Sequence, residues 1–191
     1  TNWFFDLPAY ESFLKDTVRS WEGDPRSRVG LIKTIKEFLR KPAIYVKKEL
    51  LEKVQEIKTM PAFTVTQEPQ KASSALVFAD LTHRDQAVSL LEEHKIRYRT
   101  GKTLVPFRLS GNVKWGIPVP EADGVAGLTF WVWPESLWAP ISFTKAYLGD
   151  GIEGRQWEQW WKAEDAQAYQ FIGEDNIYFY GIAELLSLIH I

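Results

Sequence analysis

The sequence has 191 residues and contains no cysteine, and only three of its residues are histidine. Disulfide bonds and thiolate metal sites are therefore excluded, and the histidines stand too far apart to indicate a metal cluster, so we predict no metal site. The absence of cysteine is consistent with a reducing compartment, and we expect a cytoplasmic protein.

A long apolar run is also missing, and neither a signal peptide nor a membrane span can be recognised. The chain begins at Thr1 rather than methionine, and we interpret its start as internal to a longer protein. At the other end, residues 186–191 (Leu-Ser-Leu-Ile-His-Ile) match the in-frame translation of a transposon adapter used in sequencing libraries. We interpret these six residues as a sequencing-adapter scar, the alternative being a helix that ends in an apolar turn.

The formal net charge of −2 gives no broad basic face of the kind that binds nucleic acid, so RNA contacts would have to come from local patches or from further segments. One basic run could contact RNA phosphates, although a solvated strand face is the simpler interpretation. The run consists of Lys95, Arg97, Arg99, Lys102 and Arg108. A hydrophobic fraction of 45% indicates a folded chain with a real core.

Residues 1–41 are predicted to form a helical segment. Apolar side chains recur on one face from the start of the chain, Asp6 is placed to cap a helix, and Pro8 fits its first turn. A turn is expected at Gly23-Asp-Pro25. A second helix is expected after Ser27, with an apolar stripe that has basic residues outside it.

Residues 42–106 are predicted to form a small α/β lobe. The expected elements are, in order, a charged helix over 47–58, a Pro-bounded segment over 61–69, a strand over 74–79, a helix capped by Thr82 or Asp85, and an alternating strand over 96–99. The succession of strand, helix and strand carries the prediction of an α/β lobe.

From residue 107 onward the pattern again alternates between strand and helix. Pro118 and Pro120 make residues 114–120 extended, and residues 121–127 are rich in turn formers. Beyond them we expect strands over 128–133 and 169–173, helices over 141–148, 155–166 and 176–184, and a Gly-Asp-Gly turn over 149–151. Such alternation favours a parallel sheet with crossover helices.

Four stretches resemble signature sequences of one family. Phe130-Trp-Val-Trp-Pro-Glu-Ser-Leu-Trp-Ala-Pro-Ile-Ser-Phe-Thr-Lys145 and Gln170-Phe-Ile-Gly-Glu-Asp-Asn-Ile-Tyr-Phe-Tyr180 are similar, without a gap, to two blocks of the methionyl-tRNA synthetases, which are class I aminoacyl-tRNA synthetases. The family forms are close to Y-V-W-F-D-A-P-I-G-Y-I-S-x-T-K and F-I-G-K-D-I-x-Y-F-H. Asn2–Pro8 resembles the H-x-F-F-x-L block that closes the family's connective domain, and Phe107–Pro120 resembles D-I-S-R-D-L-D-W-G-V-P-V-P.

The resemblance implies an α/β fold and a division of the chain. Residues 107–185 would be the second half of a Rossmann-like parallel-sheet catalytic domain, preceded by the helical segment over 1–41. Because the match to the fourth block comes far later than in the family, residues 42–106 would be an inserted small α/β lobe.

The resemblance also implies roles for residues of the two blocks. Gly173 and Asp175 match the family residues that hold the adenosine part of ATP or the adenylate, the carboxylate accepting the ribose hydroxyls. Taken alone, Asp175 is equally a plain helix N-cap. Trp133 and Phe179 match aromatic residues of the amino-acid pocket, although a tryptophan at the end of a buried strand more often belongs to a core.

The chain departs from the family around the amino acid. Ser136 and Pro140 replace a small alanine and a tyrosine, and Asn176 and Tyr180 replace an isoleucine and a histidine. Apolar pockets separate substrates that differ by a methylene by only roughly 1 to 3 kcal/mol, whereas placed polar groups select more sharply. We hypothesise a pocket that has drifted toward a more polar amino acid; the alternative is that methionine remains the substrate.

The resemblance implies an enzyme that activates an amino acid with ATP and Mg²⁺ and transfers it to tRNA. The H-I-G-H and K-M-S-K-S motifs of class I enzymes do not occur in the sequence, nor does a phosphate-binding loop of the G-x-x-x-x-G-K-[ST] type. We therefore expect these 191 residues to hold no catalytic residue and to be inactive alone, and any zinc to belong to an upstream region. Two alternatives remain: a synthetase-like paralogue with an acceptor other than tRNA, and a noncatalytic binding module.

Overall fold

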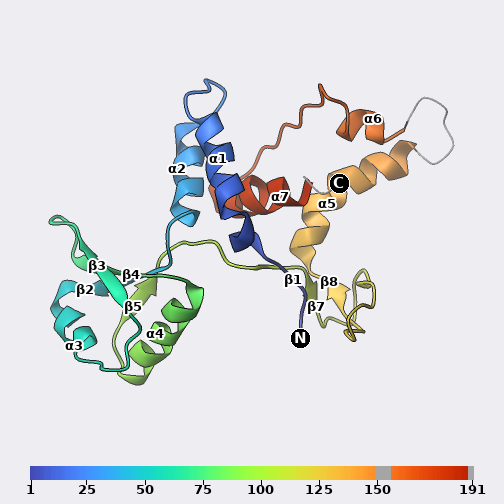
Figure 1. The fold of residues 1–191 in the computed structure, drawn as a ribbon. Coiled ribbons are helices and arrows are strands. Elements are labelled where there is room, and N and C mark those ends of the chain that lie inside the picture. The colour runs from blue at the N-terminus through green and yellow to red at the C-terminus, as the bar shows by residue number, and fades with distance from the viewer. Residues whose placement is uncertain (149–155, 189–191) are drawn as a thin grey trace. The chain divides into compact units, whose positions relative to one another are not determined.

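The computed structural model describes residues 1–148 and 156–188. The chain forms two compact units, one made of Glu11–Val105 and the other of Thr1–Tyr10 together with Pro106–Ile191 (Figure 1). The first unit carries 18 Lys and Arg against 13 Asp and Glu, and the second carries 5 against 12. We call them the basic unit and the acidic unit.

The basic unit begins with a helical hairpin of α1 (Glu11–Trp21) and α2 (Val29–Phe38). Gly23, with a φ of 85°, makes the turn between them, as expected from the Gly-Asp-Pro sequence. Leu14 and Ile35 are completely buried, so the predicted apolar stripes do face inward. Both helices were predicted, but the chain before residue 11 belongs to the acidic unit rather than to a helix that starts at residue 3.

The rest of the basic unit is a four-stranded sheet with helices on one face. Its elements are β2 (Ala43–Lys47), the 3₁₀ turn η2 (Lys48–Leu50), α3 (Leu51–Gln55), β3 (Phe63–Gln67), β4 (Ser73–Phe78), α4 (Leu81–Glu93) and β5 (Tyr98–Thr100). The strand order is β3-β4-β2-β5, and each neighbouring pair is antiparallel. This is a βαββαβ arrangement.

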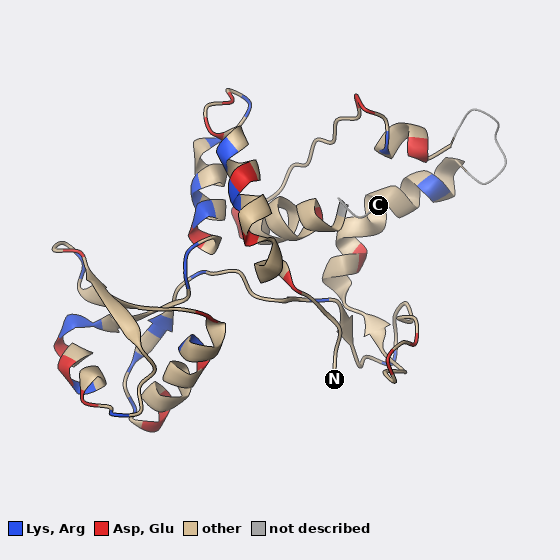
Figure 2. Cartoon of the chain, viewed as in Figure 1, with Lys and Arg blue, Asp and Glu red and all other residues tan. Residues whose placement is uncertain are grey.

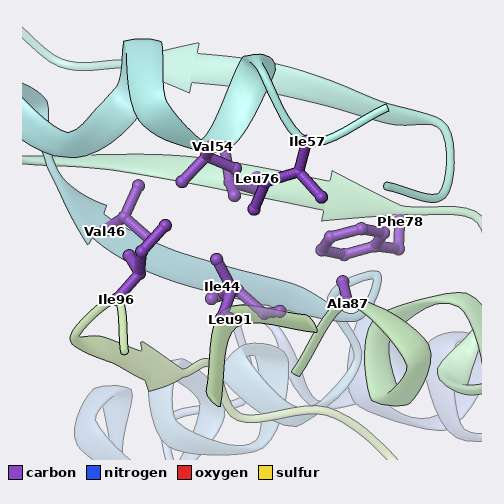
Figure 3. Close-up of a cluster of buried hydrophobic side chains, with 9 residues drawn as sticks. All are labelled: Ile44, Val46, Val54, Ile57, Leu76, Phe78, Ala87, Leu91 and Ile96. Carbon is purple, nitrogen blue, oxygen red and sulfur yellow. The ribbon is translucent and has the colours of Figure 1, made fainter. Parts of the chain in front are cut away.

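The core of this lobe lies between the sheet and its two helices. Figure 3 shows the buried side chains, which are Ile44, Val46, Val54, Ile57, Leu76, Phe78, Ala87, Leu91 and Ile96. Alternate residues of β2 and β4 point into this cluster, and the residues between them point to the opposite face, as the two-residue period of a strand requires. The opposite face has no helix of the lobe on it.

The structure differs from the prediction at four places in the lobe. β2 was missed, and the charged helix expected over 47–58 is reduced to η2 and α3 because β2 already takes residues 43–47. The Pro-bounded segment contains β3. Helix α4 is capped by Asp80, whose carboxylate accepts a hydrogen bond from the backbone N–H of His83 at 2.9 Å, rather than by Thr82 or Asp85.

The acidic unit contains two pairs of very short strands. β1 (Phe4–Phe5) pairs with β6 (Phe107–Arg108), and β7 (Ser110–Gly111) pairs with β8 (Thr129–Phe130), each antiparallel. Between β7 and β8 the chain reverses at Asp123-Gly124, where both residues have positive φ, 50° and 72°. Two successive residues with positive φ are typical of a type I′ turn, which matches the right-handed twist of the flanking strands.

Helices make up most of the remaining acidic unit. They are the 3₁₀ turn η1 (Leu7–Tyr10), α5 (Val132–Leu148), α6 (Glu158–Trp161), the 3₁₀ turn η3 (Glu174–Asn176), the π-helical turn η4 (Phe179–Ala183) and α7 (Glu184–Leu188). The helix predicted over 176–184 is confirmed, whereas the one predicted over 155–166 is reduced to α6. Arg155, the Gly-Asp-Gly turn over 149–151 and residues 189–191 of the suspected scar lie outside the described residues.

The mixed α/β class is confirmed, but the described residues contain no parallel strand pair. Residues 128–133 were expected to be one buried strand; instead α5 begins at Val132, with Pro134 in its first turn, where proline is tolerated. Residues 169–173 were expected to be the next strand and are irregular. Parallel strands pair only through long crossovers, and in the described chain residues 169–173 have no strand beside them.

Candidate functional site

The two signature blocks meet at one pair of aromatic rings in the acidic unit. Trp133, in the first turn of α5, stacks on Phe179, the first residue of η4, with ring centroids 3.7 Å apart and ring planes 3° apart. The two rings are therefore in full face-to-face contact. The structure thus brings together two residues that the sequence analysis assigned to one pocket.

Two further aromatic residues, which the sequence analysis did not assign to the site, extend this pair. Phe107 lies edge-on to Phe179 with centroids 6.1 Å apart, and Trp131 lies 6.3 Å from Phe107. The guanidinium of Arg108 sits 5.9 Å from the centre of the Trp131 ring. The position of Phe107 at the head of the block over 107–120 was the available signal. Strand β6 therefore helps to fix the ring of Phe179.

Gly173 and Asp175 lie where the irregular segment over 169–173 enters η3. The carbonyl oxygen of Gly173 accepts a hydrogen bond from the backbone N–H of Asn176 at 3.0 Å. A Cβ atom added to Gly173 would lie 2.6 Å from Oδ1 of Asp175, far inside van der Waals contact. A larger residue at 173 would therefore push the carboxylate of Asp175 away from this backbone.

The arrangement bears on the alternative role of Asp175 as a helix cap. The residue at the N-cap position of η3 is Gly173, and Asp175 lies inside the turn. The Asp175 side chain is exposed, so its oxygens are accessible to hydrogen-bond donors from a ligand.

Three of the four residues that depart from the family lie on α5 and η4, which carry the ring pair, and the fourth, Asn176, ends the preceding turn η3. Ser136 and Pro140 follow Trp133 by three and seven positions in α5, so the three share one helix face. Asn176 lies beside Gly173, its Nδ2 atom 4.0 Å from the added Cβ. Tyr180 follows Phe179 in η4, which packs against α5. Ser136, Asn176 and Tyr180 are half-buried, and Pro140 is exposed.

A buried carboxylate holds the segment before Gly173. Glu184 is 4% exposed, and its Oε1 atom accepts a hydrogen bond from Nε2 of Gln170 at 2.8 Å. Burial raises the pKa of Glu184 above its usual range, and the hydrogen bond from Gln170 acts in the opposite direction. No motif predicts this contact, because it links the second block to a residue outside both blocks.

No group of three or more histidine, aspartate or glutamate side chains gathers closely enough to hold a metal ion within residues 1–148 and 156–188. In the same residues, no helix has both the length and the apolar character needed to cross a membrane.

Comparison with known proteins decides the family. The sequence profile of the class I tRNA synthetases (M) matches residues 77–185, which is more than half of the chain. The chain belongs to this family. The match begins in β4, inside the lobe of the basic unit, and continues through the stacked ring pair to α7.

Relatives named methionine–tRNA ligase match a shorter stretch. The chain is 42% identical over 79 residues to the ligase of Porphyromonas gingivalis, which is 41% of this chain and 11% of that protein. It is 39% identical over 79 residues to the ligase of Korarchaeum cryptofilum, 14% of that protein, and 38% identical over 82 residues to the ligase of Treponema denticola, 10% of that protein. The matched stretch thus spans about a tenth of the length of these relatives. No solved structure matches the chain.

Proposed function

We propose that the chain is part of an aminoacyl-tRNA ligase of methionyl type, which activates an amino acid with ATP and transfers it to tRNA. The proposal rests first on relatives named methionine–tRNA ligase. The observation that carries it is the stack of Trp133 on Phe179 at 3.7 Å, since it joins the two blocks whose resemblance to the family implies an amino-acid pocket.

In the proposed reaction, the carboxylate of the amino acid attacks the α-phosphorus of ATP. A carboxylate-to-phosphorus bond forms, the bond to the β-phosphate oxygen breaks, and pyrophosphate leaves. Such a reaction is accelerated mainly by positioning the two substrates and by stabilising charge at the phosphates. The residues of this chain would position the substrates, and the groups that stabilise the phosphates would lie elsewhere in the complete enzyme.

The nucleotide would lie against Gly173 and Asp175. Because residue 173 has no side chain, its backbone lies directly beside the Asp175 carboxylate, and this exposed carboxylate can accept both hydroxyls of a ribose. Mg²⁺ would enter on the phosphates of ATP, since this ion is usually bound by substrate phosphates together with few protein ligands.

The amino-acid side chain would lie on the Trp133–Phe179 pair. Ser136 and Tyr180, on the segments that hold these rings, and Asn176, in the turn just before Phe179, are half-buried polar residues, and a pocket with such groups favours a side chain that can form hydrogen bonds. We therefore propose that the enzyme activates an amino acid more polar than methionine, either in place of methionine or alongside it.

The acidic unit exposes apolar side chains that a complete enzyme would cover. Phe171 is 98% exposed and Tyr169 is 79% exposed, and both lie in the segment that was expected to be a strand. We propose that this segment pairs with strands of the remaining catalytic domain and there completes a Rossmann-like parallel sheet. The chain alone would then be inactive.

The test is amino-acid-dependent exchange of pyrophosphate into ATP by the complete gene product. Methionine and a panel of polar amino acids are compared at equal concentrations. Exchange with one or more amino acids supports the proposal, and the preferred amino acid decides the proposed change of pocket. No exchange with any amino acid, by a folded protein that contains both class I motifs, would refute the proposed function.

A further inference from the structure

The open face of the sheet in the basic unit is a shallow hollow of about 550 Å³. One row of side chains crosses it in register from β3 to β5 and consists of Thr66, Ala75, Tyr45 and Arg99. Since the core of the lobe lies on the other face, where α3 and α4 pack, these side chains do not contribute to that core (Figure 3).

Tyr45 is the aromatic residue at the centre of this face. The guanidinium of Arg99 lies 5.4 Å from the centre of its ring. A Cβ added to Gly101 would lie 3.1 Å from Cε2 of the ring, so glycine leaves room for the ring to lie against the sheet. The neighbours of Tyr45 on β4 are small, Ser73 and Ala75, and they leave space beside the ring.

Cations surround the hollow. Five basic side chains line it against two acidic ones: Arg40, Lys41, Lys71, Arg99 and Lys102 against Glu37 and Glu68. Both carboxylates are already paired, Glu37 with Lys102 at 3.0 Å and Glu68 with Lys71 at 2.7 Å. The Lys102 ammonium lowers the pKa of Glu37, so this pair is fully ionised at neutral pH. The hollow is therefore positive in a chain whose formal net charge is −2.

These features fit one ligand chemistry. One class of four-stranded sheet binds single-stranded RNA by stacking unpaired bases on aromatic residues of the sheet, and arginine planes stack on bases as well. In such sites, basic side chains beside the aromatic residue contact the phosphates of the bound RNA. We propose that the open face of the sheet β3-β4-β2-β5 binds single-stranded RNA, with one base on the Tyr45–Arg99 pair and phosphates along Arg40 and Lys41.

The small residues on β4 set the expected size of the site. β2 presents Tyr45, whereas the open-face positions of β4 hold Ser73, Ala75 and Val77, so the two central strands offer a single stacking ring. We expect a short site that stacks one base, with an affinity for RNA that falls as the salt concentration rises. The inference does not require amino-acid activation, because the ring and the cations all belong to the basic unit.

The experiment is fluorescence anisotropy with the 191-residue chain and a labelled eight-nucleotide RNA of mixed sequence at low salt. Unlabelled RNA duplex and single-stranded DNA of the same sequence serve as competitors. We expect the single-stranded RNA to bind, and the duplex to compete at least tenfold more weakly. A duplex that competes as well as the single strand would overturn the proposal in favour of a purely electrostatic surface.

Three variants test the assigned residues. Tyr45→Leu removes the ring and should weaken binding about tenfold, whereas Tyr45→Phe keeps the ring and should bind within about twofold of the wild type. Arg40→Gln combined with Lys41→Gln should reduce the slope of log K against log salt by about 1.4, since each phosphate contact contributes about 0.7 on a single strand.

The matched control is Lys53→Gln combined with Lys58→Gln, which removes two exposed cations from α3 and the turn that follows it, away from the open face. It should leave both affinity and salt slope within about twofold of the wild type. Far-UV circular dichroism checks the fold of every variant. The proposal fails if no RNA binds at 100 μM protein, a concentration chosen to detect even non-specific contacts, or if the control lowers affinity as much as the Arg40 and Lys41 pair does.

Discussion

The two units of the chain differ in charge and in how completely they bury their apolar surface. The basic unit encloses its own core, and its large exposed apolar side chains are Phe13 and Val29. The acidic unit exposes many more, among them Trp115, Phe143, Tyr147, Trp160, Tyr169 and Phe171. Figure 2 shows the same contrast in charge, with Lys and Arg on α1 and α2 and few charges on α5 and α7.

This contrast indicates which unit can fold without further chain. A large number of exposed aromatic side chains in one unit indicates surface that further protein covers, whereas a closed core with a charged surface indicates an independent fold. We therefore expect the basic unit to fold and bind without further chain, and the acidic unit to need it.

The largest effect is expected from Leu76→Ala in the lobe. Leu76 is completely buried in the core cluster, and such truncations cost about 2 to 5 kcal/mol. The midpoint of the denaturation curve followed by far-UV circular dichroism should move to a lower denaturant concentration. Tryptophan fluorescence, which reports mainly on the acidic unit because only Trp21 lies in the basic one, should move little. Equal shifts of both signals would show that the units unfold as one, and Val29→Ala at an exposed site is the control.

Trp133→Ala should have the next largest effect, in the acidic unit alone. The variant loses the stacked contact with Phe179 and part of a half-buried side chain, which together cost about 2 kcal/mol. Trp115→Ala removes a tryptophan that is 88% exposed and should change stability by no more than about 0.5 kcal/mol. Urea denaturation followed by circular dichroism compares the two variants, and similar losses would mean that the stack contributes nothing specific.

Gly173→Ala tests the nucleotide site without a large expected effect on folding stability. Its Cβ would collide with the Asp175 carboxylate, so we expect kcat/KM for ATP in the complete enzyme to fall about tenfold, equal to the loss of roughly one hydrogen bond to a charged group. Gly30→Ala is the matched control, because a Cβ there meets nothing within 4 Å and replaces glycine in a helix. Pyrophosphate exchange is the measurement, and an unchanged rate in Gly173→Ala would exclude the proposed close approach.

The smallest effect is expected from Glu184→Gln and depends on pH. Because burial raises the folded-state pKa of Glu184, the folded state binds a proton that the unfolded state releases, and the free energy of unfolding falls as pH rises above about 4.5. Glutamine can still accept the hydrogen bond from Gln170. The variant should melt above the wild type at pH 7 and together with it near pH 4. A constant difference across this range would contradict the burial argument, and Glu164→Gln at an exposed site is the control.

Periodicity predicted α1, α2, α4 and β4, because each has enough apolar positions to define a face. Periodicity failed at the start of α5, because the apolar run over 128–133 looked like a buried strand. Pro134 and Glu135, which are typical of the first turn of a helix, were the signal that a helix begins there. Periodicity also missed β2 and β3, since five-residue strands between charged and proline-rich stretches carry little pattern.

The site could be predicted only through the resemblance. Trp133 and Phe179 lie far apart in the sequence, and no spacing rule places one on the other. The contacts that complete the site, from Phe107 to Phe179 and from Gln170 to Glu184, depend on how β6 and α7 pack and have no motif of their own.

The most direct test of a division of labour between the units is a crossed measurement on the complete gene product. Pyrophosphate exchange and single-stranded RNA binding are measured for Asp175→Ala and Tyr45→Leu. Asp175→Ala should lower kcat/KM for ATP by about 10- to 100-fold and leave RNA binding unchanged, whereas Tyr45→Leu should do the reverse. Loss of exchange in Tyr45→Leu, or full exchange in Asp175→Ala, would contradict the account.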